Sequence, residues 1–181
     1  AALLETLAKQ NSVDAFYRGD IAKRIAREFS KHGGLVTAED LAAFQPREVE
    51  PLRLQLDEFT VCTAPLTAGG LTTLEALAIL HTLHWKDLPA TPEREHASIE
   101  ALRWSWRDRL ELLGDPEFVD VPVAKLLSAD DVQRAAAKVQ AAVTAGKPMG
   151  LTVPRAKDAG TTNISAVDRA GNMVAVTVTQ G

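Results

Sequence analysis

Two alternating segments joined by a short turn close the chain, and this pattern constrains the fold more than any other feature of the sequence. Residues 161–168 and 172–179 alternate between apolar and small polar side chains, which is typical of strands with two unlike faces. The gap between them suits a three-residue hairpin loop in which Gly171 adopts a left-handed conformation. This loop predicts a register in which paired residue numbers sum to 340, so that Thr161 lies opposite Thr179.

The two faces of this hairpin differ in chemistry. We expect one face to pack against a core: Thr162, Ile164, Ala166, Val174, Val176 and Val178. The other face carries small, mostly hydroxyl-bearing residues: Thr161, Asn163, Ser165, Ala175, Thr177 and Thr179. Directly paired side chains on such a face are close enough to hydrogen-bond with one another. This polar face either lines a pocket or faces solvent.

The rest of the chain is predicted to be mostly helical up to about residue 145, which makes the fold class mixed α/β (α+β). Apolar periodicity predicts helices over residues 1–9, 20–32, 37–45, 71–83, 93–113 and 128–143, with Asp20, Thr37 and Ser128 at the starts of three of them. A period of two over residues 50–63 predicts a second hairpin. Residues 144–160 are rich in glycine and proline, so we expect an exposed connector.

The longest predicted helix has an apolar stripe made of Ile99, Leu102, Trp106, Leu110 and Leu113. We expect its charged residues Glu100, Arg103 and Arg107 to form the solvated face.

Composition excludes several classes of function. The chain has 20 basic and 24 acidic residues and a net charge of −4, so it lacks the basic surface of a nucleic-acid-binding protein. The single cysteine, Cys62, excludes a disulfide within the chain. His81 and His84 share a helix face, but no third ligand is spaced to complete a metal site. We therefore expect neither a metal nor a cofactor.

The junction between Gly160 and Thr161 has the chemistry of a self-cleavage site. A threonine hydroxyl is a weak nucleophile that needs an adjacent base. If the bond before Thr161 were cut, its free α-amino group would supply that base, because such amines have a pKa of about 7.7–8.0. Gly160 lacks a Cβ atom and tolerates a strained backbone during the attack.

Several motifs in this chain resemble those of the γ-glutamyltranspeptidase (γ-glutamyltransferase) family. The processing region carries Asp158-Ala159-Gly160-Thr161-Thr162, Val167-Asp168, Gly171-Asn172 and Val176-Thr177-Val178-Thr179. Earlier motifs follow in the family's order: Asp14-Ala15-Phe16-Tyr17-Arg18-Gly19, Gly33 to Leu41, Gly69-Gly70, Leu113-Gly114-Asp115-Pro116 and Phe118-Val119-Asp120. The resemblance covers nearly the whole chain.

The resemblance implies a piece of an N-terminal-nucleophile hydrolase, an αββα sandwich. Residues 1–160 would belong to the large subunit and 161–181 to the small subunit, both within one incomplete structural domain. Thr161 would attack the γ-glutamyl amide of glutathione or a related compound, and water or an amino acid would accept the acyl group. Thr179 would orient the nucleophile, and Thr162 would support it. Family members are commonly periplasmic, secreted or attached to the cell surface.

Two positions depart from the family pattern. Asn163 stands where many members have histidine, and Gly181 stands where well-known members have an asparagine that helps to bind the glutamyl group. The family's substrate-binding arginine and oxyanion-hole glycines would lie outside this chain, which we expect to be a segment of a longer protein and inactive alone. Two alternatives remain: a related cephalosporin or glutaryl acylase, and a non-catalytic member that is never cleaved.

Overall fold

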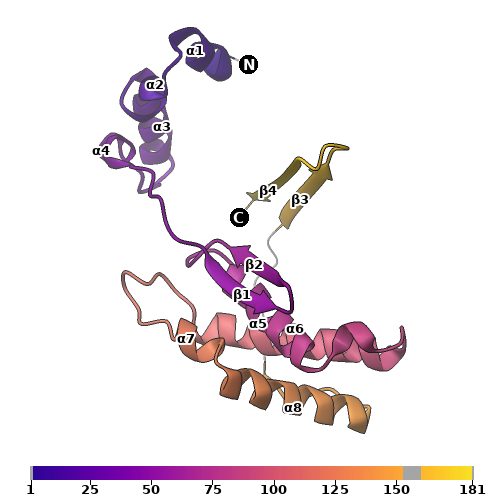
Figure 1. Cartoon of the computed structure of the whole chain (residues 1–181). Helices are drawn as coiled ribbons and strands as arrows, with labels where there is room; N and C mark the ends of the chain where they lie inside the picture. The colour runs from indigo at the N-terminus through magenta and orange to yellow at the C-terminus, as the bar shows by residue number, and fades with distance from the viewer. Residues whose placement is uncertain (1, 153–159, 181) are drawn as a thin grey trace. The chain divides into compact units, whose positions relative to one another are not determined.

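The computed structural model describes residues 2–152 and 160–180. The chain divides into two compact units, one up to Val49 and the other from Glu50 onward. Figure 1 labels the α-helices and strands of both units. Among the described residues, no helix has the length and apolar character needed to cross a lipid bilayer.

The first unit is entirely helical in its regular elements. It contains α1 (Ala2–Gln10), α2 (Asp14–Tyr17), α3 (Asp20–Lys31) and α4 (Ala38–Ala43). Ile21 and Ala22 at the start of α3 are its buried apolar residues, and Tyr17 stacks on Phe44 with ring centroids 5.2 Å apart. Three of these helices were predicted from apolar periodicity. The four-residue α2 is too short to produce a periodic signal.

The predicted N-cap of α4 is confirmed, and the predicted N-cap of α3 is wrong. Thr37 caps α4 as expected: its hydroxyl accepts a hydrogen bond from the Asp40 amide at 3.1 Å, while the Asp40 carboxylate accepts one from the Thr37 amide at 2.8 Å. These bonds hold the pKa of Asp40 below its usual value. Asp20 is not the cap of α3. Gly19 takes that position, and Asp20 is the first helical residue, where its charge suits the helix dipole.

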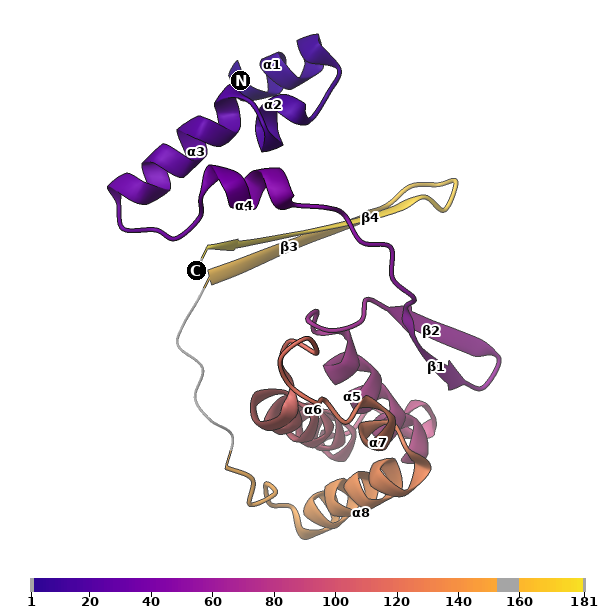
Figure 2. The same ribbon diagram turned by 90° about the vertical axis from the view of Figure 1, so that its left-hand side faces the viewer.

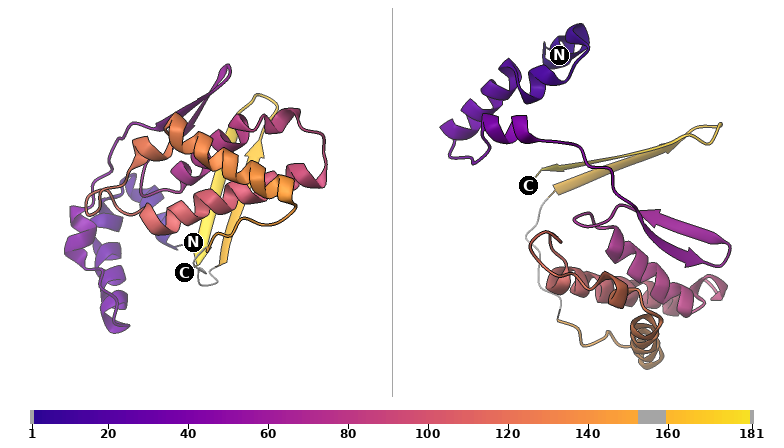
Figure 3. Two further views of the ribbon diagram at one scale, coloured as in Figure 1. Left: turned by 90° about the horizontal axis from the view of Figure 1, so that it is seen from below. Right: turned by 60° about the vertical axis from the view of Figure 1, so that its left-hand side comes forward.

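The second unit combines a hairpin with packed helices. Its elements up to the connector are β1 (Leu52–Leu56), β2 (Phe59–Thr63), α5 (Gly70–Thr82), the 3-10 helix η1 (Trp85–Asp87), α6 (Pro92–Leu112), α7 (Val123–Leu126) and α8 (Ala129–Ala145). The predicted hairpin over residues 50–63 is confirmed, with Leu52 opposite Thr63. Helices α5, α6 and α8 pack against one another, as Figures 2 and 3 show. Their shared core consists of Ala78, Ile79, Ala97, Ala101, Val132, Ala135, Ala136 and Val139.

Helix α6 buries a different face from the one predicted. Its expected apolar stripe is largely exposed, with 55% of Ile99 and 56% of Leu102 accessible. The buried face instead holds Ala97, Glu100, Ala101, Ser105 and Asp108. Small side chains such as Ala97 and Ala101 allow α5 and α8 to approach closely, and this close packing outweighs the apolar stripe. The assignment of Glu100 to a solvated face was therefore wrong, because only 1% of this residue is exposed.

The connector after α8 was expected to be exposed, but its first residues contact the helical core. Helix α8 begins at its predicted cap, Ser128, and ends at Gly146, which has a left-handed φ of 61°. The side chain of Met149 then packs against the helical core. Residues 153–159 of the predicted connector lie outside the described residues.

A buried carboxyl pair links α5 to α6. The pKa of Glu75, which is 3% exposed, rises from 4.5 to about 9 because of burial first, and then because of a hydrogen bond with Asp108 and the charge of that residue. Asp108 also accepts a hydrogen bond from Arg107 Nε at 2.8 Å. Glu75 is therefore protonated at neutral pH and donates to Asp108.

Replacing Glu75 should remove a pH dependence of stability. Between pH 4.5 and about 9 the folded chain binds more protons than the unfolded chain, so stability falls as pH rises through this window. Glu75→Gln cannot ionise, and its stability relative to the parent should increase by about 1–3 kcal/mol from pH 5 to pH 9 in denaturant titrations. The exposed carboxylate change Glu111→Gln is the control. Parallel pH profiles for the parent and Glu75→Gln would contradict this assignment.

Candidate active site

The second hairpin consists of β3 (Gly160–Val167) and β4 (Met173–Gln180). The strands are antiparallel, and their register is the predicted one: Thr161 lies opposite Thr179, and Asn163 lies opposite Thr177. The junction between Gly160 and Thr161 is thus at the first residue of a strand, with the backbone of Thr179 directly across from it.

A turn built around Asp168 sets this register. Gly171 has a φ of 83°, the left-handed conformation expected from the loop length. The Asp168 carboxylate accepts hydrogen bonds from the amides of Ala170 and Asn172, each at 2.9 Å, and from Asn172 Nδ2 at 2.8 Å. These bonds, led by the one from the Asn172 side chain, hold the pKa of Asp168 below its usual value. The loop length alone predicted the turn, but it did not reveal the role of Asp168.

A chain of hydrogen bonds follows the polar face of this hairpin. Asn163 Nδ2 donates to Thr177 Oγ1 across the strands at 2.8 Å, and Ser165 Oγ donates to Asn163 Oδ1 at 3.1 Å. Residues two apart in a strand share a face, so this chain lies beside the pair formed by Thr161 and Thr179. The side chain of Asn163 is therefore oriented toward its cross-strand neighbour.

The apolar face was expected to be buried, but it is exposed in this chain. The accessible fraction is 66% for Ile164, 56% for Val174 and 50% for Val176. Alternation predicts which side chains share a face, whereas burial depends on what covers that face.

The remaining predicted residues fall at the edges of this site. Gly160 is paired with Gln180, and Thr162 with Val178 on the apolar face. Gly181 lies outside the described residues. Within residues 2–152 and 160–180, no three His, Cys, Asp or Glu side chains gather in a group that could hold a metal ion.

The whole chain, residues 1–181, matches the protein family described as Gamma-glutamyltranspeptidase. The chain belongs to the γ-glutamyltranspeptidase family. It is 35% identical to the glutathione hydrolase proenzyme of Escherichia coli (strain K12) over 99% of this chain, and 34% identical to that of Pseudomonas sp. (strain A14) over 96% of this chain. It spans 31% of the length of each of these two relatives.

Two solved structures also superpose on this chain. The γ-glutamyltranspeptidase from Pseudomonas nitroreducens complexed with L-DON superposes with a TM-score of 0.69 and 30% identity, covering 81% of this chain and 46% of that one. A cephalosporin acylase from Bacillus halodurans superposes with a TM-score of 0.66 and 32% identity, covering 76% of this chain and 25% of that one. The predicted fold class, helices with small antiparallel sheets in an N-terminal-nucleophile hydrolase, is confirmed.

Removing the Asn172 side chain should raise the pKa of Asp168. Its lowered pKa means that the turn is stabilised above pH 3.8, and that this stabilisation is lost as pH falls through the folded-state pKa. A carbon-13 NMR titration should place the Asp168 midpoint below 3.8 in the parent and closer to 3.8 in Asn172→Ala. Arg169→Ala separates a general charge effect from these hydrogen bonds. An unchanged midpoint in Asn172→Ala would disprove the assigned cause.

Proposed function

We propose that this chain is part of a self-processing γ-glutamyltransferase or glutathione hydrolase with Thr161 as its nucleophile. The observation that carries the proposal is the position of Thr161, at the first residues of β3 and directly opposite Thr179. Membership of the γ-glutamyltranspeptidase family and the similarity to two glutathione hydrolase proenzymes support it.

Processing would begin with attack of the Thr161 hydroxyl oxygen on the carbonyl carbon of Gly160. The carbon–nitrogen bond between the two residues breaks, the nitrogen takes up the hydroxyl proton, and an ester joins Gly160 to the threonine oxygen. Water then hydrolyses this ester, which gives a carboxylate on Gly160 and a free Thr161 with its own α-amine. The new amine is the base that a threonine nucleophile needs.

Turnover would repeat the same chemistry on a substrate. The Thr161 oxygen attacks the γ-carbonyl of a γ-glutamyl compound, its proton passes through the α-amine to the departing amine, and an acyl-enzyme ester forms. Water or the amine of an amino acid or peptide then attacks this ester and releases Thr161. Thr179 would orient the nucleophile, while Thr162 and Asn163 would support this arrangement. Gly181 would adjoin the bound glutamyl group.

This mechanism divides the chain into two products. Residues 1–160 would end the large subunit, and 161–181 would begin the small subunit of the same precursor. The names of the relatives, which are proenzymes, support such a precursor. The partners would then be the two subunits, a γ-glutamyl substrate, and water or an amino-acid acceptor.

A second candidate keeps the nucleophile but changes the acyl group. The superposition on a cephalosporin acylase, with a TM-score of 0.66, favours this alternative. Gly181 is the position that bears on the choice, because glycine has no side chain with which to bind a glutamyl group.

Replacing Thr161 should abolish self-cleavage. In the full-length gene product that contains these residues, the parent should separate into two fragments, with a new N-terminus at Thr161. Thr161→Ala should remain a single chain because it lacks the attacking oxygen, whereas Thr161→Ser should still cleave. Intact-mass spectrometry detects all three results. An uncut parent would identify a non-catalytic family member and end this proposal.

The cleaved parent then distinguishes the two acyl groups. We expect release of the chromophore from a γ-glutamyl anilide and little release from a glutaryl anilide. The reverse preference would favour the acylase, while leaving Thr161 as the nucleophile.

Thr179 and Thr177 provide a matched pair on one face of β4. Thr179→Val should lower kcat for the γ-glutamyl anilide roughly 10- to 100-fold, because the nucleophile loses its orienting partner. Thr177→Val makes the same chemical change two residues away and should keep kcat within about threefold, since its hydroxyl contacts Asn163 instead. Equal losses in the two variants would show that neither threonine orients the nucleophile specifically.

A further inference from the structure

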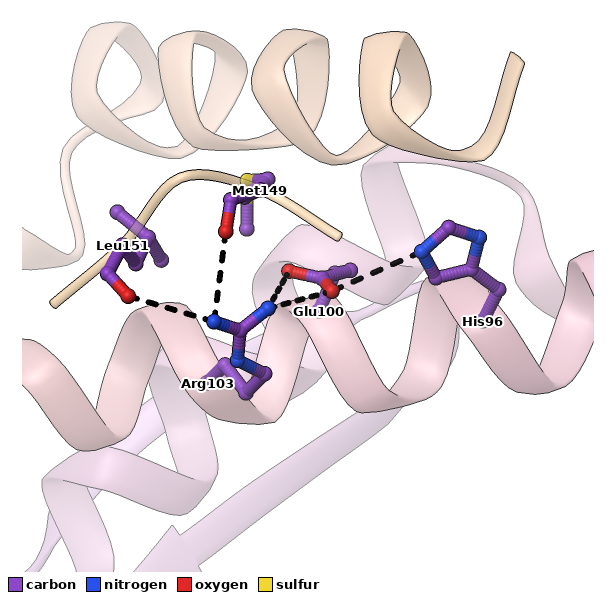
Figure 4. A network of polar contacts seen from close by, with 5 residues as sticks. All are labelled: His96, Glu100, Arg103, Met149 and Leu151. Carbon is purple, nitrogen blue, oxygen red and sulfur yellow. Dashed lines mark hydrogen bonds and ion pairs between the residues drawn. The ribbon is translucent and has the colours of Figure 1, made fainter. Parts of the chain in front are cut away.

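Arg103 connects helix α6 to the segment that follows α8. Its Nη1 donates hydrogen bonds to both carboxylate oxygens of Glu100, at 2.7 and 2.9 Å. Its Nη2 donates to the backbone carbonyls of Met149 and Leu151, each at 3.3 Å. Figure 4 shows the guanidinium group between the carboxylate and the passing chain. One side chain therefore bridges two segments almost fifty residues apart in sequence.

The burial of Glu100 determines the direction of this guanidinium group. The Glu100 side chain is 2% exposed, and a carboxylate that is shielded from water is costly unless it is paired. Arg103 supplies the pairing charge, and His96 Nε2 approaches the same carboxylate at 3.6 Å. A guanidinium is planar, so fixing one nitrogen on Glu100 also fixes where the other nitrogen points.

The segment held by Arg103 leads to the proposed cleavage site. Leu151 precedes Gly160 by nine positions, so Gly160 lies within roughly 30 Å of the anchored residue, whatever path the chain takes. Without this anchor, the last fixed point would be Met149, whose side chain packs against the helical core, eleven positions before Gly160. The limit on its distance would then be roughly 40 Å, and the direction of the chain after Met149 would no longer be set.

We propose that Arg103, oriented by Glu100, is a positioning residue for cleavage at Gly160. By holding residues 149–151 against the helical unit, it limits the reach and direction of the segment that carries the Gly160–Thr161 bond. This role rests on the proposed self-processing and deepens it. Arg103 acts only through the chain that it holds and touches none of the reacting atoms.

The test is the rate of self-cleavage in the full-length gene product. The protein is made by cell-free synthesis, and the cleaved fraction is followed over time by intact mass. Arg103→Ala should slow cleavage by less than about twofold from the longer tether alone, and by up to about tenfold from loss of the direction of the segment. Arg103→Lys should fall between the parent and Arg103→Ala, because one ammonium group cannot contact Glu100 and both carbonyls with the geometry of a guanidinium.

Arg94→Ala is the matched control. Arg94 lies on the same helix and stacks over Trp85 at 4.0 Å from the ring centroid, so its loss also removes packing from α6. It should leave the cleavage rate unchanged. Melting temperatures of both alanine variants, measured in the uncleavable Thr161→Ala background, report any general loss of stability.

A second readout separates positioning from a purely structural role. Once cleaved, Arg103→Ala protein should turn over the γ-glutamyl anilide with a kcat within about twofold of the parent, because its task ends with processing. Cleavage at the parental rate in Arg103→Ala would overturn the proposal. So would equal slowing in Arg94→Ala, or an equal loss of kcat in the cleaved variant. An uncut parent would instead show that the proposed function itself fails, and this role with it.

Discussion

The pairing of one buried carboxylate organises the second unit. Glu100 lies on the face of α6 that packs inward, where small neighbours such as Ala97 and Ala101 let the helices approach closely. A charge in this position requires a partner, and Arg103 provides it. The same arginine then determines where the chain passes after α8. A single requirement for charge pairing thus links helix packing to the route of the backbone.

The two sides of the Gly160–Thr161 junction depend on separate physical causes. Upstream, the chain is anchored by an arginine that reaches it from a distant helix. Downstream, the strand is placed by a local turn, in which the Asp168 carboxylate gathers two backbone amides and the Asn172 side chain. The anchor depends on tertiary packing, whereas the turn is specified within a few residues. The junction is where these long-range and local constraints meet.

Features that depend on neighbouring residues, such as strand register and helix position, were predictable from the sequence. Features that depend on tertiary packing, such as the buried face of a helix, were not. The loop length gave the register of β3 and β4 because backbone geometry alone relates the two. Periodicity located α6 but misidentified its buried face, because it records where apolar groups lie and not which neighbours fit closely. The hydrogen bond between Asn163 and Thr177 follows from the register, yet the side-chain geometry was needed to see it. The anchoring of Leu151 has no local signature at all.

The length of the three-residue loop also fixes which side chains of β3 and β4 share a face. Successive side chains of a strand point to opposite faces of the sheet. A register shift of one residue therefore moves every side chain of that strand to the other face. One inserted or deleted residue between Asp168 and Asn172 would place Thr161 across from a neighbour of Thr179. The two threonines would then no longer share a face. Some positions of this turn therefore tolerate substitution, but the turn does not tolerate an insertion or a deletion.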